Sequence, residues 1–397
     1  NRILLDNTEA PLAGMSRPLL SYDLGAALPA GTLVVRFGHL QDRLLIWTFL
    51  GGSMGFEQRP MPAAELVRKV QRCRSVLARE AAGPEPEAPC NALAQDLLPK
   101  RLQELAAGGS VLVIPDEATA PLPFAALRTA PDAPFLIERY FLSYAPSLTL
   151  LLTLDSTPLA APHPAPRSAL FIADPEFNTD LFPFLPRLPA ARQAGLRYAA
   201  HYPHAEVIDG RRATIPNVLA ALQRVELLEF DGHGLTNAQA PELGGLLLAP
   251  DSRSPASSTV LTAADLPTGL HRRLRLVILG ACSTGLTAYR DSAEVAGLVA
   301  TFIARGVPEV VASAWEVQDD RTAELLDRLH QALAAGLPAA AALRSAQLAL
   351  LRLRPADPDT STWAAFQVFQ GAKRSAPSVY ERERPTFRQP AFTEGMR

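Results

Sequence analysis

Residues 168–371 alternate short apolar runs with amphipathic stretches, and no other feature limits the fold of this chain as much. The apolar runs predict strands at 168–173, 205–209, 225–230, 275–280, 308–314 and 364–369. The amphipathic stretches predict helices at 188–201, 214–223, 292–305, 320–335 and 337–353. Strands that alternate with helices are typical of βαβ units, which build parallel sheets. The sequence therefore predicts an α/β fold, with a mostly parallel sheet and helices on both of its faces.

The part of the chain before residue 168 gives weaker signals. Two β-rich runs at 32–37 and 43–49, joined by a short polar turn, predict a hairpin. Helices are expected at 62–80 and 91–107, and strands at 111–116 and 137–144. A proline-rich stretch at 155–167 predicts a boundary between two parts of the chain.

Composition narrows the class of function. The net charge of the 397 residues is -2, which gives no reason to expect nucleic acid as a partner. No apolar run reaches the ~20 residues of a membrane span, so no membrane association is expected. The three cysteines, Cys73, Cys90 and Cys282, form no metal-binding motif and fit a reducing cytoplasm better than a disulfide-built fold.

Two of the predicted strands end on reactive side chains. The run DGHG at 231–234 follows one strand, and the run GACS at 280–283 follows another. Functional residues gather beyond the carboxyl ends of strands in an open parallel sheet, so both side chains are expected at one edge. A histidine beside a cysteine raises the thiolate fraction or takes the thiol proton. His233 and Cys282 are therefore the candidate base and nucleophile, and the backbone N–H groups of Gly234 and Cys282 are candidates for stabilising an oxyanion.

Each of these residues also has a simpler interpretation. A cysteine after an apolar strand is more often a small buried hydrophobic residue, and a histidine in a glycine-rich turn is more often structural. The position of both at strand ends is what favours catalysis. Cys73 and Cys90 have no histidine near them in the sequence, so we expect both to be incidental and their replacement by alanine to be near neutral.

Six motifs, in order along the chain, resemble those of CHAT domains, which are relatives of caspases and separases. The runs FDGHG at 230–234 and LGACSTG at 279–285 resemble the histidine and cysteine motifs of that family. The other segments that resemble it are 113–116 with 122–127, 294–298 with 306–308, 312–320 and 362–371. The likeness covers residues 110–371, with a looser fit at the hairpin 32–50.

The resemblance implies a caspase-like fold, a mostly parallel sheet flanked by helices, with a degenerate caspase-like N-terminal half. Together with the predicted elements and the polar, Arg- and Pro-rich composition of the tail, it divides the chain into an N-terminal hairpin and helices (1–110), a pseudo-caspase part (111–160), a catalytic domain (168–371) and a mobile tail (372–397). It further implies a bacterial, cytoplasmic cysteine endopeptidase that needs no metal or organic cofactor and cleaves a protein substrate. A regulatory protein or a helical-repeat region is the further partner that it suggests.

Two segments are expected to govern specificity and control. The loop 315–320 resembles the separase loop that sets an acidic residue against a substrate arginine, so Trp315, Asp319 and Asp320 are candidate substrate-binding residues. Arginine, then lysine, is expected before the cleaved bond; the alternatives are a helix N-cap role for the aspartates and an apolar pocket. The segment 234–262 lies between the two catalytic strands and is a candidate for reordering on activation, with an inert surface loop as the equal alternative.

Three functions therefore stay open at this stage. The first is a cysteine endopeptidase, the second a catalytically silent CHAT-like interaction module, and the third an unrelated α/β hydrolase or transferase. The presence of both His233 and Cys282 favours the first over the second. The third is weakened because the sequence has neither a G-x-S-x-G elbow nor a glycine-rich phosphate loop.

Overall fold

The structure is a computed structural model. It describes residues 31–79, 88–148, 151, 165–235, 244–251, 259–267, 270, 273–280, 288–290, 294–296, 298–315, 317, 319–353 and 360–371. For 288–290, 294–296 and 319–320 it describes the backbone alone.

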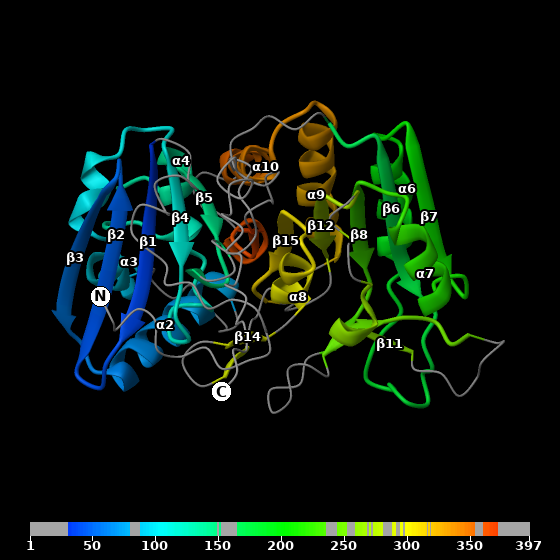
Figure 1. Cartoon of the computed structure of the whole chain (residues 1–397), viewed down its shortest axis with the longest axis horizontal. Helices are drawn as coiled ribbons and strands as arrows, with labels where there is room; N and C mark the ends of the chain where they lie inside the picture. The colour runs from blue at the N-terminus through cyan, green and yellow to red at the C-terminus, as the bar shows by residue number, and fades with distance from the viewer. Residues whose placement is uncertain are drawn as a thin grey trace, which may run out of the picture.

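One sheet of eleven strands forms the centre of the described chain (Figure 1). Its strands are β1 (Thr32–His39), β2 (Arg43–Leu50), β3 (Ser53–Pro60), β4 (Ser110–Ile114), β5 (Phe141–Tyr144), β6 (Ser168–Pro175), β7 (His204–Gly210), β8 (Leu227–Asp231), β12 (Leu276–Leu279), β15 (Glu309–Ser313) and β16 (Phe366–Gln370). Their order is β3-β2-β1-β4-β5-β16-β15-β12-β8-β6-β7.

Two blocks of parallel strands meet at one antiparallel pair. One block consists of β15, β12, β8, β6 and β7, which are parallel to one another. The other block consists of β1, β4, β5 and β16, which are also parallel to one another. β16 comes from the last part of the described chain and runs antiparallel to β15, which joins the blocks. The antiparallel strands β2 and β3 extend the first block outward. The prediction of an α/β fold with a large, mostly parallel sheet is confirmed.

Helices flank this sheet. They are α2 (Ala63–Ala78), α3 (Ala88–Leu97), α4 (Leu136–Arg139), α6 (Pro189–Ala199), α7 (Ile215–Leu222), α8 (Leu298–Ala304), α9 (Asp319–Ala334), α10 (Ala339–Leu353) and α11 (Thr360–Trp363), with the 3₁₀ turns η1 (Lys100–Glu104), η2 (Phe124–Ala126) and η4 (Ala263–Asp265). α6 packs on β6 and beside α9, and α9 packs beside α10. Every residue of β8 and β12 is buried, as expected for strands covered on both faces.

The apolar core follows the two-residue period of the strands. Leu33 and Val35 of β1 point into the main core, which extends through the second block to Phe230 of β8. Val34 lies between them in sequence and packs instead into a smaller cluster with Leu112 on the other face. Both faces of the first block are therefore apolar near β1 and β4.

Sequence and structure differ at several elements, among them the following four. The stretch 137–144 is not one strand but α4 followed by β5, because the Glu138 carboxylate accepts a hydrogen bond from the Phe135 amide at 2.8 Å and starts a helical turn. The predicted helix 91–107 stops at Leu97 because Pro99 interrupts it, and η1 follows. The predicted helix 292–305 is shortened to α8, with β14 (Glu294–Ala296) before it. β3 was not predicted, since its residues are largely exposed and only pairing with β2 makes them a strand.

The division into four segments stays a prediction. The sheet is continuous across the two blocks, and the expected boundary at 155–167 falls between β5 and β6. Residues 155–164 of that boundary and the tail 372–397 lie outside the described residues.

Cys73 of α2 and Cys90 of α3 form a disulfide, with their Cα atoms 4.8 Å apart and a separation of 17 positions in the sequence. Both residues are buried. The expectation that they are incidental is wrong, because the packing of α2 on α3 brings together two cysteines that look unrelated in the sequence. Disulfides are typical of oxidising compartments, so the cysteines no longer favour a cytoplasmic location, which stays a prediction.

We expect the Cys73→Ser/Cys90→Ser double variant to lower the free energy of unfolding by roughly 3 kcal/mol, because the bridge restricts the unfolded chain. The measurement is urea unfolding of the wild type and the variant, each with and without reductant. The matched control is Cys282→Ser, which keeps the bridge and should keep its response to reductant. A wild-type unfolding midpoint that reductant does not move would show that the bridge adds no stability.

Candidate active site

His233 lies just beyond the end of β8. β8 pairs in parallel with β12, and Phe230 is the register partner of Leu279. The Gly280 amide donates a hydrogen bond to the Phe230 carbonyl at 2.9 Å, so the two segments remain hydrogen-bonded one residue beyond the end of β12. His233 follows Phe230 by three residues, and Cys282 follows Leu279 by three. Cys282 itself lies outside the described residues, so its position beside His233 stays a prediction.

The His233 imidazole is held on two sides. Its Nε2 lies 2.7 Å from the carbonyl oxygen of Pro186, and a carbonyl can only accept, so Nε2 is the nitrogen that donates. In a neutral imidazole this leaves Nδ1 as a proton acceptor. The Phe177 ring lies edge-on to the imidazole, with centroids 5.3 Å apart. The Leu247 amide donates to the His233 carbonyl at 2.9 Å, which fixes the backbone as well.

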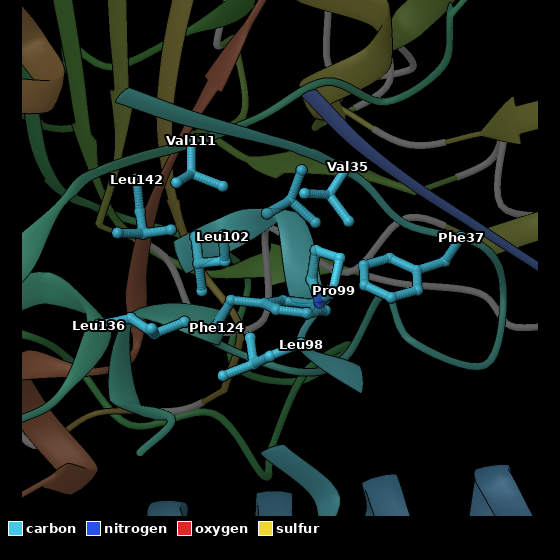
Figure 2. A pocket seen from close by; sticks show the side chains of 10 residues that line it. Val35, Phe37, Leu98, Pro99, Leu102, Val111, Phe124, Leu136 and Leu142 are labelled. Atoms are coloured by element: carbon cyan, nitrogen blue, oxygen red, sulfur yellow. The ribbon is translucent and has the colours of Figure 1, made fainter. Parts of the chain in front are cut away.

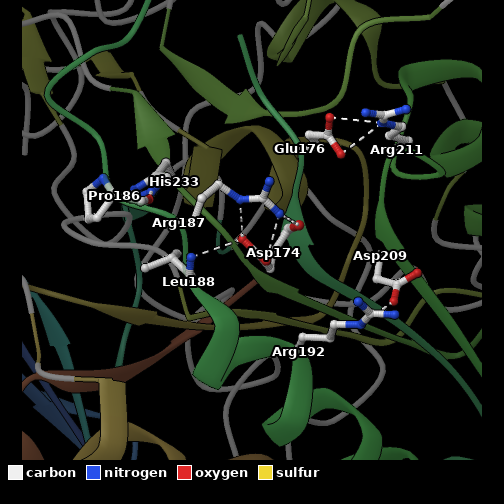
Figure 3. A network of polar contacts seen from close by, with 9 residues as sticks. All are labelled: Asp174, Glu176, Pro186, Arg187, Leu188, Arg192, Asp209, Arg211 and His233. Atoms are coloured by element: carbon white, nitrogen blue, oxygen red, sulfur yellow. Dashed lines mark hydrogen bonds and ion pairs between the residues drawn. The ribbon is translucent and has the colours of Figure 1, made fainter. Parts of the chain in front are cut away.

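Asp174, near the end of β6, holds the segment that supplies the Pro186 carbonyl (Figure 3). Arg187 donates through Nε and Nη2 to the two carboxylate oxygens of Asp174 at 3.0 and 2.8 Å, and the Leu188 amide donates at 3.0 Å. The hydrogen bonds to Asp174, together with its negative charge, raise the pKa of the Arg187 guanidinium. Asp174 has a φ of 45°, an uncommon conformation for a residue other than glycine. A set of contacts therefore leads from β6 through Arg187 and Pro186 to His233.

Two glycines permit close packing at this edge, Gly280 between β12 and β8 and Gly232 between β8 and β6. A Cβ atom on Gly280 would lie 2.2 Å from Oδ1 of Asp231, which is buried. A Cβ atom on Gly232 would lie 2.6 Å from the Phe230 ring. A side chain at Gly280 would push its segment away from Asp231, and one at Gly232 would displace the Phe230 ring.

The remaining predicted site residues lie in different surroundings. Gly234 belongs to β9 (Gly234–Leu235), where it pairs with Leu246. Trp315 is 2% exposed, and its Nε1 donates to the Ser361 carbonyl at 2.8 Å, so the indole supports the loop from within. Asp319 and Asp320 begin α9, and their side chains lie outside the described residues. Contact of these three side chains with a substrate, and the oxyanion role of Gly234, stay predictions.

The segment 234–262 contains a small antiparallel sheet. β9 pairs with β10 (Gly245–Leu247), and β10 pairs with β11 (Val260–Thr262). Residues 236–243 and 252–258 of the segment lie outside the described part of the chain. Because β10 is bonded to the His233 carbonyl, a movement of this small sheet would reach the site; the gating role stays a prediction.

A buried polar network ties β8 to its neighbouring helices. Glu229 of β8 and His330 of α9 are bonded through Oε2 and Nε2, and both side chains are 0% exposed. The Tyr202 hydroxyl lies 2.7 Å from Nδ1 of His330, and the Tyr198 ring of α6 stacks on the imidazole with centroids 4.7 Å apart. The network fixes α6 and α9 against β8, the strand that leads to His233. α6 begins next to Leu188, and α9 begins at the predicted specificity loop.

Burial determines the protonation of this pair. It raises the pKa of the Glu229 carboxyl well above its usual value, and it lowers the pKa of the His330 imidazole to about 3. Both groups therefore favour their neutral forms in the folded protein. The one titrating proton that the pair holds is then on the Glu229 carboxyl, and the His330 imidazole keeps only its usual single N–H.

Sequence reasoning missed the residues that surround His233. Pro186, Asp174 and Arg187 lie in or next to a loop with no periodic pattern, and the backbone carbonyl of Pro186 has no sequence signal at all. Glu229 is the one available signal, since a charged residue inside an apolar strand requires a buried partner.

The family model described as CHAT domain matches residues 87–372. The chain belongs to the CHAT domain family. The match covers well over half of the chain, and it includes His233, Cys282 and all elements from α3 to β16. No curated protein matches the sequence.

Solved structures of cysteine peptidases are similar to the CHAT domain chain at low identity. The Arg-specific cysteine proteinase gingipain R is 11% identical, with a TM-score of 0.44, and the match covers 78% of this chain and 75% of that one. The complex of the RgpB pro- and mature domains from Porphyromonas gingivalis is 12% identical, with a TM-score of 0.44, and the match covers 78% of this chain and 76% of that one. The separase–securin complex from Saccharomyces cerevisiae is 10% identical, with a TM-score of 0.47, and the match covers 87% of this chain and 30% of that one.

Within the described residues, no group of three or more His, Cys, Asp or Glu side chains is arranged to hold a metal ion. Of the helices in the described part of the CHAT domain chain, none combines the length and the apolar character that a membrane span requires. Independence from metals and cofactors stays a prediction.

We expect Glu229→Gln to make stability sensitive to acid. In the unfolded chain Glu229 and His330 titrate near pH values of about 4.3 and 6.5, so between these values both states hold one proton on the pair and its contribution is flat. In Glu229→Gln only His330 titrates, and its pKa is lowered in the folded state. The unfolded chain then gains a proton below pH 6.5 while the folded protein does not, so stability is lost as pH falls.

The expected extra loss in the free energy of unfolding between pH 7 and pH 5 is about 2 kcal/mol. It is measured by urea unfolding at several pH values. Glu206→Gln, which changes a surface carboxylate on β7, is the control and should run parallel to the wild type. Parallel curves for Glu229→Gln and the wild type would contradict the assigned proton.

Proposed function

We propose that this CHAT domain is a cysteine endopeptidase in which Cys282 is the nucleophile and His233 the base. The main support is the register of β8 and β12: the two residues follow paired positions by the same number of residues. Neighbouring strands lie about 4.8 Å apart, so side chains at equivalent positions beyond their ends are within reach of each other. Further support is the orientation of the imidazole, whose Nε2 is engaged by Pro186 and whose Nδ1 is left to accept a proton.

The proposed reaction needs only these groups and water. Nδ1 of His233 takes the proton of the Cys282 thiol, and the thiolate attacks the carbonyl carbon of the substrate peptide bond. Backbone N–H groups of Cys282 and Gly234 stabilise the oxyanion that forms. The C–N bond then breaks, and the imidazolium gives its proton to the leaving amine. Water, activated by the same imidazole, hydrolyses the thioester and regenerates the thiol.

The proposed substrate is a protein, and activity is proposed to be gated by a partner protein, a ligand or proteolysis. The bond between Leu247 and the His233 carbonyl supports a gate formed by the segment 234–262, since it links that segment to the base. Unchanged hydrogen exchange in this segment between inactive and active protein would remove it as the gate.

Replacing either member of the dyad is expected to stop cleavage. Cys282→Ala removes the nucleophile and should abolish activity. His233→Ala should lower the rate by ~10²–10⁴, since that is the usual worth of base assistance. His204→Ala changes an exposed histidine of β7 and should leave the rate unchanged. The rates are measured on a mixed peptide library and on candidate protein substrates, with circular dichroism as the check of folding.

Full activity in either dyad variant would overturn the assignment. The catalytically silent interaction module is the alternative function, and a thiol-directed peptide probe separates the two. The peptidase should label at Cys282 in a manner that requires His233. Partner binding without such labelling, in any activating condition, would favour the silent module.

Specificity for arginine, then lysine, before the cleaved bond is the matching expectation for Asp319 and Asp320. A carboxylate that pairs with a guanidinium contributes about 1.5–3 kcal/mol, so Asp319→Asn or Asp320→Asn should lower kcat/KM for arginine substrates by about ten- to a hundredfold. Asparagine caps helices as well as aspartate does, so the amide variants preserve an N-cap on α9 and isolate the charge.

The control is Glu324→Gln, which removes an acid of α9 that pairs with Arg328. Cleavage after leucine, unaffected by the two amide variants, would favour an apolar pocket and leave the dyad untouched.

A further inference from the structure

One end of the large sheet is formed by β3, and no other strand of the described chain pairs with its outer edge (Figure 1). The two glycines at 51–52 have φ angles of 56° and 81°, as in a two-residue hairpin turn, so Leu50 and Ser53 face each other as a hydrogen-bonded pair. Bonded and non-bonded pairs alternate along an antiparallel ladder, so the odd-numbered residues of β3 bond to β2. The Met61 amide continues this alternation, since it donates to the Asp42 carbonyl at 3.1 Å.

The even-numbered residues of β3 therefore turn their backbone groups outward. The outer edge presents the amides and carbonyls of Met54, Phe56 and Gln58, followed by the carbonyl of Pro60. Pro60 has no N–H to donate, and proline is tolerated at this outward position because no bond to β2 is lost there. A row of outward N–H and carbonyl groups is a template for one more strand.

The odd-numbered face of β3 is occupied. The Glu57 carboxylate accepts a hydrogen bond from the first amide of η1 at 2.8 Å, and Arg59 donates to the Leu98 carbonyl, just after α3, at 2.8 Å. Leu98 also lines a small apolar cavity together with Val35 and Phe37 of β1 (Figure 2). The end of α3 and η1 thus cover this face of the strands.

The even-numbered face of β3 is apolar and open. Met54 and Phe56 are 55% and 54% exposed. The Phe56 ring packs beside Trp47, its register partner on β2, with centroids 5.6 Å apart. Large apolar side chains beside a row of outward backbone groups favour pairing with a strand of another chain.

The opposite edge strand of the sheet, β7, is protected against such pairing. Its register with β6 shifts at Pro175, and Arg212 donates to the Val207 carbonyl at 2.9 Å while it pairs with Asp209. Irregular register and charged side chains are the usual means of preventing edge pairing. The open face of β3 has neither over residues 54–58, because its side chains there are Met, Phe and Gln.

We propose that β3 pairs with β3 of a second copy of this chain, antiparallel and about a two-fold axis at Phe56. In this register Phe56 faces Phe56 of the second copy and Met54 faces Gln58, so the outward N–H groups of these residues meet carbonyls. Trp47 and Phe56 of the two copies then form one aromatic row across the joint. β3 and β8 are far apart in the strand order, so the pairing does not depend on the proposed peptidase function.

The neighbouring registers are less favourable. An axis at Glu57 would place the two Glu57 carboxylates directly opposite each other, which is destabilising. An axis at Gln58 would place Phe56 against Pro60, which has no N–H to donate. With the axis at Phe56, Glu57 faces Gly55 of the second copy instead. β3 is therefore complementary to itself in one register, which favours a second copy over an unrelated peptide as the partner.

The oligomeric state is measured by sedimentation velocity on the full chain carrying Cys282→Ala, at concentrations up to about 100 μM. This parent protein should form a dimer whose share rises with concentration. Gln58→Pro removes an outward N–H and no bond to β2. It should raise the dissociation constant of the dimer by about tenfold or more, because a hydrogen bond is lost on each side of the axis. Gln58→Ala keeps the N–H, so it is the matched control and should dimerise like the parent.

Substitutions of Phe56 test the register. Phe56→Lys and Phe56→Glu should each be monomeric, because like charges then meet at the axis. An equal mixture of the two should form a mixed dimer, because opposite charges then face each other. Circular dichroism and thermal unfolding of each variant confirm that it is folded.

A parent protein that stays monomeric over the whole concentration range would overturn the proposal. So would a dimer that Gln58→Pro leaves intact, or a mixture of the two Phe56 variants with no more dimer than either alone. Hydrogen exchange gives a second measurement: the Phe56 and Gln58 amides should exchange slowly only when the dimer is present. Slow exchange of these amides in the monomer would show that another segment of the same chain covers the edge, and would also overturn the proposal.

Discussion

The parallel pairing of β8 with β12 is the constraint on which the rest of the second block depends. Both strands are buried on both faces, so their register is fixed by apolar packing as well as by backbone hydrogen bonds. A slip by one residue would move Glu229 away from His330 and bring Asp231 out of contact with Gly280. Pairing of Phe230 with Leu279 therefore sets, in one step, the buried polar network and the place where the two motif segments leave the sheet.

His233 shows how a base can be prepared by its surroundings. The hydrogen bond to the Pro186 carbonyl makes Nε2 of His233 the donor, and the Phe177 ring packs edge-on against the imidazole and holds its plane. The Leu247 amide holds the His233 backbone through its carbonyl. The Pro186 carbonyl depends in turn on the pair between Asp174 and Arg187. Each of these contacts comes from a different element, so the orientation of the imidazole is a property of the packed second block and not of the motif around it.

The first block has a different character. Its helices α2 and α3 are joined by the Cys73–Cys90 disulfide. The bridge limits how far α3 can move relative to α2.

The sequence by itself determined the α/β class, most strands of the second block, and the candidates His233 and Cys282, because period-two and helical patterns and strand-end motifs are local properties. It missed β3 and the turn of α4, where pairing with β2 and a single side-chain cap decide the conformation. It also missed the disulfide, Pro186, Asp174 and the partner of Glu229. These contacts join residues that are 13 to 101 positions apart, such as Asp174 with Arg187 and Glu229 with His330. Only the tertiary structure decided them, because no local pattern records which distant residue will fill a given place in the packed core.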